Sequence, residues 1–244
     1  MGFLKNTVRA KKKELGLKIS KRSLKKALQG KSVKIIAEIK QKSPSKGILR
    51  TNLDVAKVLK YYNKYACAVS VVTDARFNGS FDLVREVRAE TKLPILVKDF
   101  VLHELQLFEA KLSGADAILL LASLLDNKKI NEFIAKGKEI GLECLVEVHS
   151  KEEMKRVLKS KAELIGVNNR NLRTLKIDLE NAERILQSVP KREFEKRIFI
   201  AESGYENYSQ ISNLNGKVNA FLVGSSLMLA KNLDNKLREL KGEL

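Results

Sequence analysis

Eight short apolar runs alternate with longer amphipathic segments along most of the chain, and this rhythm restricts the fold more than any other feature. The runs are rich in Val, Ile, Leu and Ala, as expected of β-strands that are buried on both faces. The predicted strands are Val33–Ile39, Ala68–Thr73, Ile95–Lys98, Ala117–Leu121, Glu143–Val148, Leu164–Val167, Ile198–Ala201 and Ala220–Val223.

A helical pattern follows each run. In Leu53–Tyr65, apolar residues recur at intervals of three and four, which places them on one face of a helix. Strand and helix in alternation indicate a parallel sheet, and eight such units in 244 residues favour a closed (β/α)₈ TIM barrel over an open sheet. The other helices are predicted at Phe81–Glu90, Leu105–Leu112, Lys128–Ile140, Glu152–Leu158, Leu179–Gln187, Tyr208–Leu214 and Leu233–Leu240.

Residues 1–32 precede the first strand. Phe3–Leu15 and Ser23–Leu28 are each expected to be helical, so residues 1–32 are predicted to form a short helical N-terminal extension. No Pro-, Gly- or Ser-rich linker separates this extension from the barrel of residues 33–244. We therefore expect residues 1–244 to form a single α/β domain.

The chain is strongly basic, with 47 Lys and Arg against 29 Asp and Glu. A basic arm at residues 1–32 can bind nucleic acid or an anionic membrane, whereas a Lys-rich surface also steers anionic substrates to a site. Aromatic residues make up only 6% of the chain and Trp is absent, so platforms for stacking bases are not evident. We favour an anionic small-molecule substrate and expect no nucleic-acid or membrane binding.

The sequence also gives expectations about the cellular compartment and about metal binding. No apolar stretch approaches the roughly 20 residues that span a bilayer, and the N-terminus lacks the apolar segment of a secretory signal. Cys67 and Cys144 each lie in an apolar run, which predicts buried free thiols and a cytoplasmic protein. His103 and His149 are the only histidines and no Cys-x-x-Cys occurs, so no metal is expected.

Charged and polar side chains stand at the ends of several predicted strands. In a (β/α)₈ barrel the catalytic groups lie at these C-terminal ends. Glu38 and Lys40 share one face of the first strand, and an unpaired charge facing the helices would be costly, so both are expected to point into the barrel mouth. A structural ion pair is an equal explanation for any one charge, but the whole set favours a ligand site. The other members are Lys98, Glu147, Asn168 and Glu202.

Two Ser/Gly pairs predict a phosphate site. Ser203 and Gly204 follow the seventh strand, while Gly224 and Ser225 follow the eighth and open a short helix expected at Ser225–Leu229. Backbone N–H groups at a helix start favour an anion, and phosphate is usually bound after these two strands of such a barrel. Either pair alone is also ordinary turn chemistry.

These strand ends resemble the indole-3-glycerol-phosphate synthase family. The combination of EIKxxSPSxG, KDF, LVEVH and NNRNL, in this order, is highly specific, although Tyr205 stands where family members commonly carry Ile. The matching stretches are IIAEIKQKSPSKG (35–47), SVVTD and FNGS (70–80), LPILVKDF (93–100), GADAILLLASLL (114–125), LVEVH (145–149), IGVNNRNL (165–172), AESG (201–204) and VGSSLM (223–228).

The resemblance implies that the chain converts 1-(2-carboxyphenylamino)-1-deoxyribulose 5-phosphate into indole-3-glycerol phosphate, a decarboxylating lyase step of tryptophan biosynthesis without cofactors. It implies that Lys98 is the general acid, with a pKa lowered by partial burial and nearby cations. Glu147 would be the base or would stabilise positive charge on nitrogen, and Lys40 would hold a substrate anion or donate a second proton.

The resemblance also assigns supporting roles. Glu38 and Glu202 would orient the lysines, and Asn168 would contact substrate hydroxyls or Glu147. The remaining implied site residues are Ser203, Gly204, Gly224 and Ser225 for phosphate, Phe77, Phe100 and Leu119 for the aromatic ring, and Ser43 and Arg170 for loops or the substrate carboxylate. Core packing is the alternative for the three apolar residues.

The residues alone are also compatible with other functions. A sugar-phosphate isomerase, or an aldolase that forms a Schiff base on Lys98, would use similar strand ends. A nucleic-acid-binding protein that uses residues 1–32 belongs to another class, and converging charges disfavour a purely structural barrel. We expect a monomer, with association with other tryptophan-pathway enzymes left open.

Overall fold

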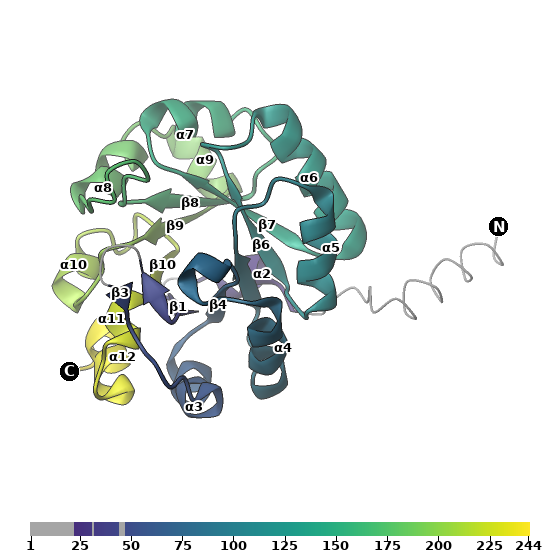
Figure 1. The fold of residues 1–244 in the computed structure, drawn as a ribbon. Helices are drawn as coiled ribbons and strands as arrows, with labels where there is room; N and C mark the ends of the chain where they lie inside the picture. Colours follow the sequence, from purple (N-terminus) through teal and green to yellow (C-terminus); the bar gives the residue numbers. More distant parts are fainter. Residues whose placement is uncertain (1–21, 31, 44–46) are drawn as a thin grey trace.

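A closed barrel of eight parallel strands forms the centre of the computed structural model, which describes residues 22–30, 32–43 and 47–244 (Figure 1). Each strand pairs with the next along the chain, and the last closes on the first. The predicted (β/α)₈ fold is therefore confirmed. The strands are β1 (Ile35–Ile39), β4 (Ala68–Val72), β5 (Ile95–Lys98), β6 (Ala117–Leu121), β7 (Glu143–Val148), β8 (Leu164–Asn168), β9 (Ile198–Glu202) and β10 (Ala220–Val223).

Helices surround the barrel on all sides (Figure 1). Asp54, Ser80, Asp126 and Ser150 each accept a hydrogen bond from a backbone N–H at the helix start that they precede, which fixes where those helices begin. Predicted and observed ends of the barrel elements agree to within two residues. The helices are α3 (Val55–Tyr65), α4 (Phe81–Glu90), α5 (Glu104–Leu112), α6 (Asn127–Ile140), α7 (Lys151–Val157), α8 (Glu180–Leu186), α10 (Tyr208–Ser212) and α12 (Leu233–Lys241).

Several short elements were not predicted. They lie in the connections between strands and helices, where the apolar period is too short to detect. Two of them, β2 and β3, form a small antiparallel hairpin in the loop after β1. The short elements are β2 (Lys42–Ser43), β3 (Gly47–Ile48), the 3₁₀ helix η1 (Ala75–Phe77) and α9 (Lys191–Lys196), whereas α11 (Ser225–Met228) was expected.

The strand residues divide into two hydrophobic clusters. Ile35, Ala37 and Ile39 face outward and pack with the helices, whereas Ile36 packs inside the barrel. Because side chains alternate along a strand, Glu38 points to the same interior as Ile36. The inner cluster extends to Leu24 and Leu28, so α2 (Leu24–Ala27) closes the barrel floor and the helix expected at Ser23–Leu28 is confirmed. The predicted helix Phe3–Leu15 lies outside the described residues.

The two cysteines differ in exposure. Cys144 is buried as predicted, but Cys67 is only partly buried, so the prediction of burial is wrong for Cys67. Cys67 stands just before β4 and donates a hydrogen bond to the Ile35 carbonyl. Among the described residues, no helix is both long enough and apolar enough to cross a membrane.

A buried carboxylate joins the floor segment to the barrel. Asp116 is 1% exposed and accepts hydrogen bonds from Nε of Arg22 at 3.0 Å, from an amino group of Arg88 at 3.0 Å and from the backbone N–H of Ile95 at 3.1 Å. Arg22 precedes α2 and Arg88 belongs to α4, so this carboxylate connects three separate parts of the chain.

We expect Asp116→Ala to lower the free energy of unfolding by about 3 kcal/mol, because it leaves two guanidinium groups without their buried partner. Urea denaturation followed by circular dichroism measures the change. Asp82→Ala is the matched control, because its carboxylate is 87% exposed and pairs only at the surface with Arg85. An equal effect of the two substitutions would contradict the anchoring role of Asp116.

Candidate active site

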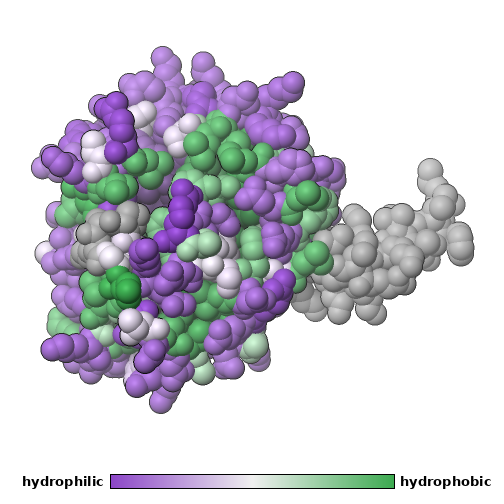
Figure 2. Space-filling view, viewed as in Figure 1, coloured by the Kyte–Doolittle hydropathy of each residue, from purple (hydrophilic) through white to green (hydrophobic). Residues whose placement is uncertain are grey.

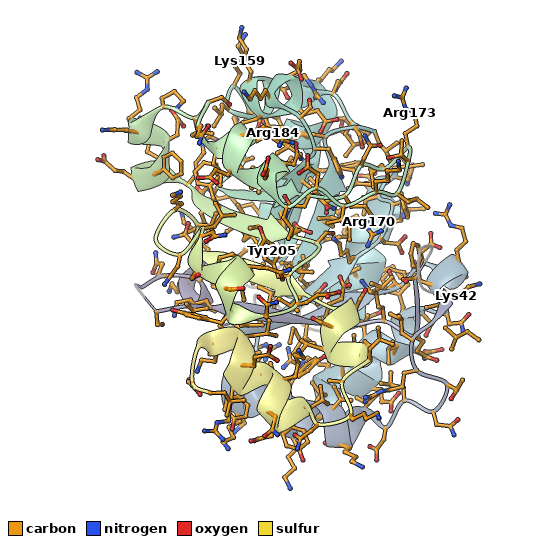
Figure 3. All side chains as sticks on the ribbon, turned by 90° about the vertical axis from the view of Figure 1, so that its left-hand side faces the viewer. Lys42, Lys159, Arg170, Arg173, Arg184 and Tyr205 are labelled. Carbon is orange, nitrogen blue, oxygen red and sulfur yellow. The ribbon has the colours of Figure 1, made fainter. Side chains whose placement is uncertain are left out.

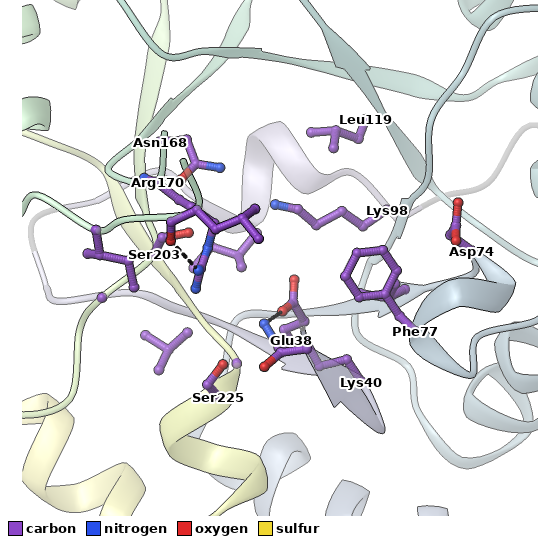
Figure 4. Close-up of a pocket in the computed structure, with 18 of the residues that line it drawn as sticks. Glu38, Lys40, Asp74, Phe77, Lys98, Leu119, Asn168, Arg170, Ser203 and Ser225 are labelled. Atoms are coloured by element: carbon purple, nitrogen blue, oxygen red, sulfur yellow. Dashed lines mark hydrogen bonds and ion pairs between the residues drawn. The ribbon is translucent and has the colours of Figure 1, made fainter. Parts of the chain in front are cut away.

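The C-terminal ends of the strands open into one cavity of about 780 Å³. Every predicted site residue lines this cavity except Glu202, which lies directly beneath it and is fully buried. Lys98 extends across the middle of the cavity, with Asn168 and Arg170 on one side and Phe77 on the other (Figure 4). The structure thus brings the predicted residues together, although they are spread over almost 190 positions, from Glu38 to Ser225.

Lys98 forms the centre of a buried ionic cluster. Its Nζ lies 2.7 Å from Oε2 of Glu202 and 3.0 Å from Oε2 of Glu147. The second oxygen of Glu147 accepts a hydrogen bond of 2.9 Å from the side-chain amide of Asn168. The Glu147 carboxylate is therefore fixed on both oxygens, and its plane is set before any substrate binds.

The pKa values of this cluster follow from burial and pairing. Burial alone would lower the pKa of Lys98, but Glu147, Glu202 and Glu38 raise it above the ordinary lysine value. The predicted decrease in the pKa of Lys98 is therefore wrong, because the nearest charges are carboxylates and not cations. Burial alone would raise the pKa of Glu147, but Lys98 and then His149 lower the pKa below the ordinary value. The pKa of Glu202 is raised, because burial and the negative charge of Glu147 outweigh the attraction of Lys98.

Glu38 and Lys40 form a second pair beside the first. Nζ of Lys40 lies 2.6 Å from Oε1 of Glu38, and both side chains point into the cavity (Figure 4). Burial alone would raise the pKa of Glu38, but Lys40 and Lys98 lower it, so this carboxylate is ionised. Gly224 leaves space for this pair, because a Cβ on it would lie 2.4 Å from Oε1 of Glu38 and would force that carboxylate to move.

The two predicted phosphate-binding loops lie side by side on the cavity wall. Ser203 and Gly204 follow β9 and have φ values of 68° and 94°, a left-handed conformation that is costly for Ser203. The Asn169 side chain supports this turn by donating to the Ser203 carbonyl and to the Tyr205 hydroxyl, each at 3.1 Å. Across from it, Gly224 directly precedes α11, whose first residue is Ser225.

Apolar side chains and loops form the rest of the cavity. Phe77, Phe100 and Leu119 line it, but Leu119 also packs in the inner barrel cluster, so both of its predicted roles are compatible with its position. Ser43 is buried in the β2–β3 hairpin. The Arg170 guanidinium donates to the Leu175 carbonyl at 2.9 Å and thereby holds its own loop.

Basic side chains stand around the mouth. Lys42 and Arg173 are exposed, and they extend from the side of the molecule where Arg170 lies (Figure 3). Figure 2 views the mouth directly and shows hydrophilic residues over much of its rim. Positive charge in this position attracts an anionic ligand.

Sequence reasoning missed His149 as a site residue. Nε2 of His149 lies 2.9 Å from Oε1 of Glu147, and its Nδ1 lies 3.4 Å from Oε2 of Glu153. The sequence signal that identifies His149 is its spacing of two residues from Glu147, since two residues along a strand bring a side chain back to the same face. No group of three or more possible metal-ligating residues occurs within the described ranges.

The fold and the cavity define a (β/α)₈-barrel enzyme with a lysine–glutamate cluster at the C-terminal mouth of the barrel. The family model described as indole-3-glycerol phosphate synthase matches residues 4–240, and the chain belongs to this family.

Named relatives agree with this assignment. An indole-3-glycerol phosphate synthase of Petrotoga mobilis is 40% identical over 98% of this chain and 96% of its own length. One of Endomicrobium trichonymphae is 40% identical over 90% of this chain and 84% of its own length. A tryptophan biosynthesis protein TrpCF of Buchnera aphidicola is 43% identical over 88% of this chain, which corresponds to 47% of that longer protein.

Proposed function

We propose that this chain converts 1-(2-carboxyphenylamino)-1-deoxyribulose 5-phosphate into indole-3-glycerol phosphate, carbon dioxide and water. The observation that carries the proposal is the placement of Lys98 between Glu147 and Glu202 at the base of the cavity. A proton donor and a carboxylate within 3.0 Å of each other can serve successive steps on one substrate.

Ring closure begins at the substrate carbonyl. Lys98 donates a proton to the carbonyl oxygen while the ring carbon that bears the carboxylate forms the new carbon–carbon bond. Carbon dioxide then leaves, and its bonding electrons restore the aromatic ring. Loss of the hydroxyl as water and removal of a proton, which Glu147 accepts, complete the indole. Lys40 protonates that hydroxyl or holds a substrate anion.

The residues of the cavity wall support a proposal for substrate binding. Ser203, Gly204, Gly224 and Ser225 bind the phosphate, and Phe77, Phe100 and Leu119 contact the aromatic ring. Arg170 and Ser43 hold the substrate carboxylate and the adjoining loops, while Glu38 and Glu202 balance the charges of the two lysines. Asn168 keeps Glu147 in place or contacts a substrate hydroxyl.

The setting of the reaction is part of the proposal. We propose that residues 1–244 act as one domain and as a monomer in the cytoplasm, without nucleic acid, membrane or cofactor. The relatives named TrpCF are longer proteins, and this supports association with other enzymes of tryptophan biosynthesis.

A fluorescence assay for indole formation from the carboxyphenylamino sugar phosphate tests the proposal. We expect turnover by the purified chain that is unchanged by a metal chelator. Absence of indole product would contradict the proposal. Inactivation by borohydride in the presence of substrate would favour the aldolase instead, although a lysine with a raised pKa is poorly suited to form a Schiff base because the amine must be neutral to attack.

A further inference from the structure

His149 occupies a position behind the Glu147 carboxylate and outside the cavity lining. It stands two residues after Glu147, at the point where β7 ends, and its side chain is 11% exposed. One ring nitrogen lies 2.9 Å from Glu147 and the other 3.4 Å from Glu153, which is in the first turn of α7. The ring therefore bridges a site carboxylate to a carboxylate near the protein surface.

Three carboxylates at the base of the cavity share two ammonium groups. Glu38, Glu147 and Glu202 are at most 3% exposed, and Lys40 and Lys98 are the ammonium groups paired with them. Three buried carboxylates beside two ammonium groups favour protonation of one carboxylate, and Glu202, whose pKa is raised by burial and by the repulsion of Glu147, is the group that takes the proton. A positive charge on His149 acts directly on Glu147 and opposes its protonation.

We propose that His149, held by Glu153, is a positioning residue that keeps the Glu147 carboxylate ionised for proton transfer. This inference rests on the proposed function, because it takes Glu147 to be the group that accepts the substrate proton. Asn168 and Lys98 donate hydrogen bonds to the same carboxylate from β8 and β5, and the His149 ring adds a third, ionic contact.

The surroundings of His149 favour its charged form. Burial alone would lower the pKa of His149, but Glu147 and Glu153 raise it to about 9. The charged groups that act on the ring are Glu147 on β7 and Glu153 on α7, and Arg156 on α7 acts on Glu153. From α8, the Asn181 side chain donates a neutral hydrogen bond to the His149 carbonyl at 3.2 Å. His149 is thus cationic at neutral pH and loses its charge as the pH rises through 9.

Two neighbouring glutamates on α7 provide a matched test. Glu153→Gln removes the charge beside His149 but keeps an oxygen that can accept the His149 backbone N–H. Glu152→Gln makes the same change on an exposed residue of the same turn. We expect the His149 ring in Glu153→Gln to lose its proton about half a pH unit or more below its value in Glu152→Gln, because Glu153 is one of the two carboxylates that raise the pKa of His149, and NMR titration of the ring protons measures the difference.

His149→Ala removes the cation itself. We expect its acid limb to move upward by about one pH unit, which means a tenfold loss of kcat on that limb, with recovery at higher pH and little change in KM. A residue needed only for folding would instead lower activity by the same factor at every pH. If His149→Ala does not fold, the two α7 variants decide the question.

The outcomes separate this inference from the proposed function. Without indole product from the unchanged chain, the proposed function fails and this inference fails with it. If the unchanged chain is active but His149 titrates at the same pH in Glu153→Gln and Glu152→Gln, or the acid limb of His149→Ala does not move, only the role of His149 is overturned. A uniform loss at every pH, or a change confined to KM, also overturns it.

Discussion

Lys98→Ala is expected to lower kcat by at least about 100-fold, which is the effect of losing a general acid. The substitution also leaves Glu147 and Glu202 buried together without the ammonium group that lies within 3.0 Å of both. These carboxylates would then share a proton. The variant therefore loses the general acid, Lys98, and Glu147 also becomes a weaker base. Ring closure itself, and not product release, is the step that should slow.

The raised pKa of Lys98 specifies how this acid works. At neutral pH the group is fully protonated and ready to donate, but it gives up its proton only where negative charge develops next to it. The carbonyl oxygen of the substrate supplies that charge as the ring closes. Lys98 therefore stabilises the developing oxyanion and also delivers the proton.

Single-turnover fluorescence measures the loss, because it separates ring closure from product release. Lys92→Ala is the control, since Lys92 is exposed and precedes the same strand, β5. The control should retain normal turnover. Near-normal ring closure by the Lys98 variant would show that another group is the acid, with Lys40 the first candidate because it lines the same cavity.

Much of the site was predictable because strand period and barrel topology are both simple. Glu38 and Lys40 had to share a face, and a closed parallel barrel brings all strand ends to one mouth. The pairing of the charges was not predictable. Lys98 lies between two glutamates from strands β7 and β9, and no spacing along the chain encodes that proximity. The sign of its pKa shift depended on this pairing, so the sequence-based expectation was wrong.

Smaller features of the structure could not be predicted from the sequence for related reasons. The β2–β3 hairpin has two residues in each strand, which is too short for an alternating pattern to be visible. From the sequence alone, His149 stands out only as a possible metal ligand. Its contact with Glu153 depends on how α7 begins, where Ser150 caps the helix and Glu153 accepts the His149 backbone N–H at 2.7 Å.

Glu147→Gln is expected to lower kcat by at least about 100-fold while changing KM much less, because an amide cannot accept the substrate proton. Glutamine has nearly the same shape, so the cavity keeps its volume, but its single amide oxygen can accept from only one of Asn168 and Lys98. Lys98 loses one of its two nearest negative charges, which lowers its pKa toward the ordinary lysine value. The acid thus remains available, and the loss of turnover reports on the base.

Steady-state kinetics with the fluorescence assay provide the measurement, and Glu143→Gln provides the control. Glu143 begins the same strand at the barrel floor, where its carboxylate accepts hydrogen bonds from Ser23 and the Lys25 backbone. The amide oxygen of glutamine can still accept one of these bonds, so this variant should keep normal turnover. If Glu147→Gln instead raised KM and left kcat unchanged, Glu147 would bind the substrate equally in the ground and transition states. Proton removal would then require a different carboxylate, and Glu202 is the group within reach, because it shares Nζ of Lys98 with Glu147.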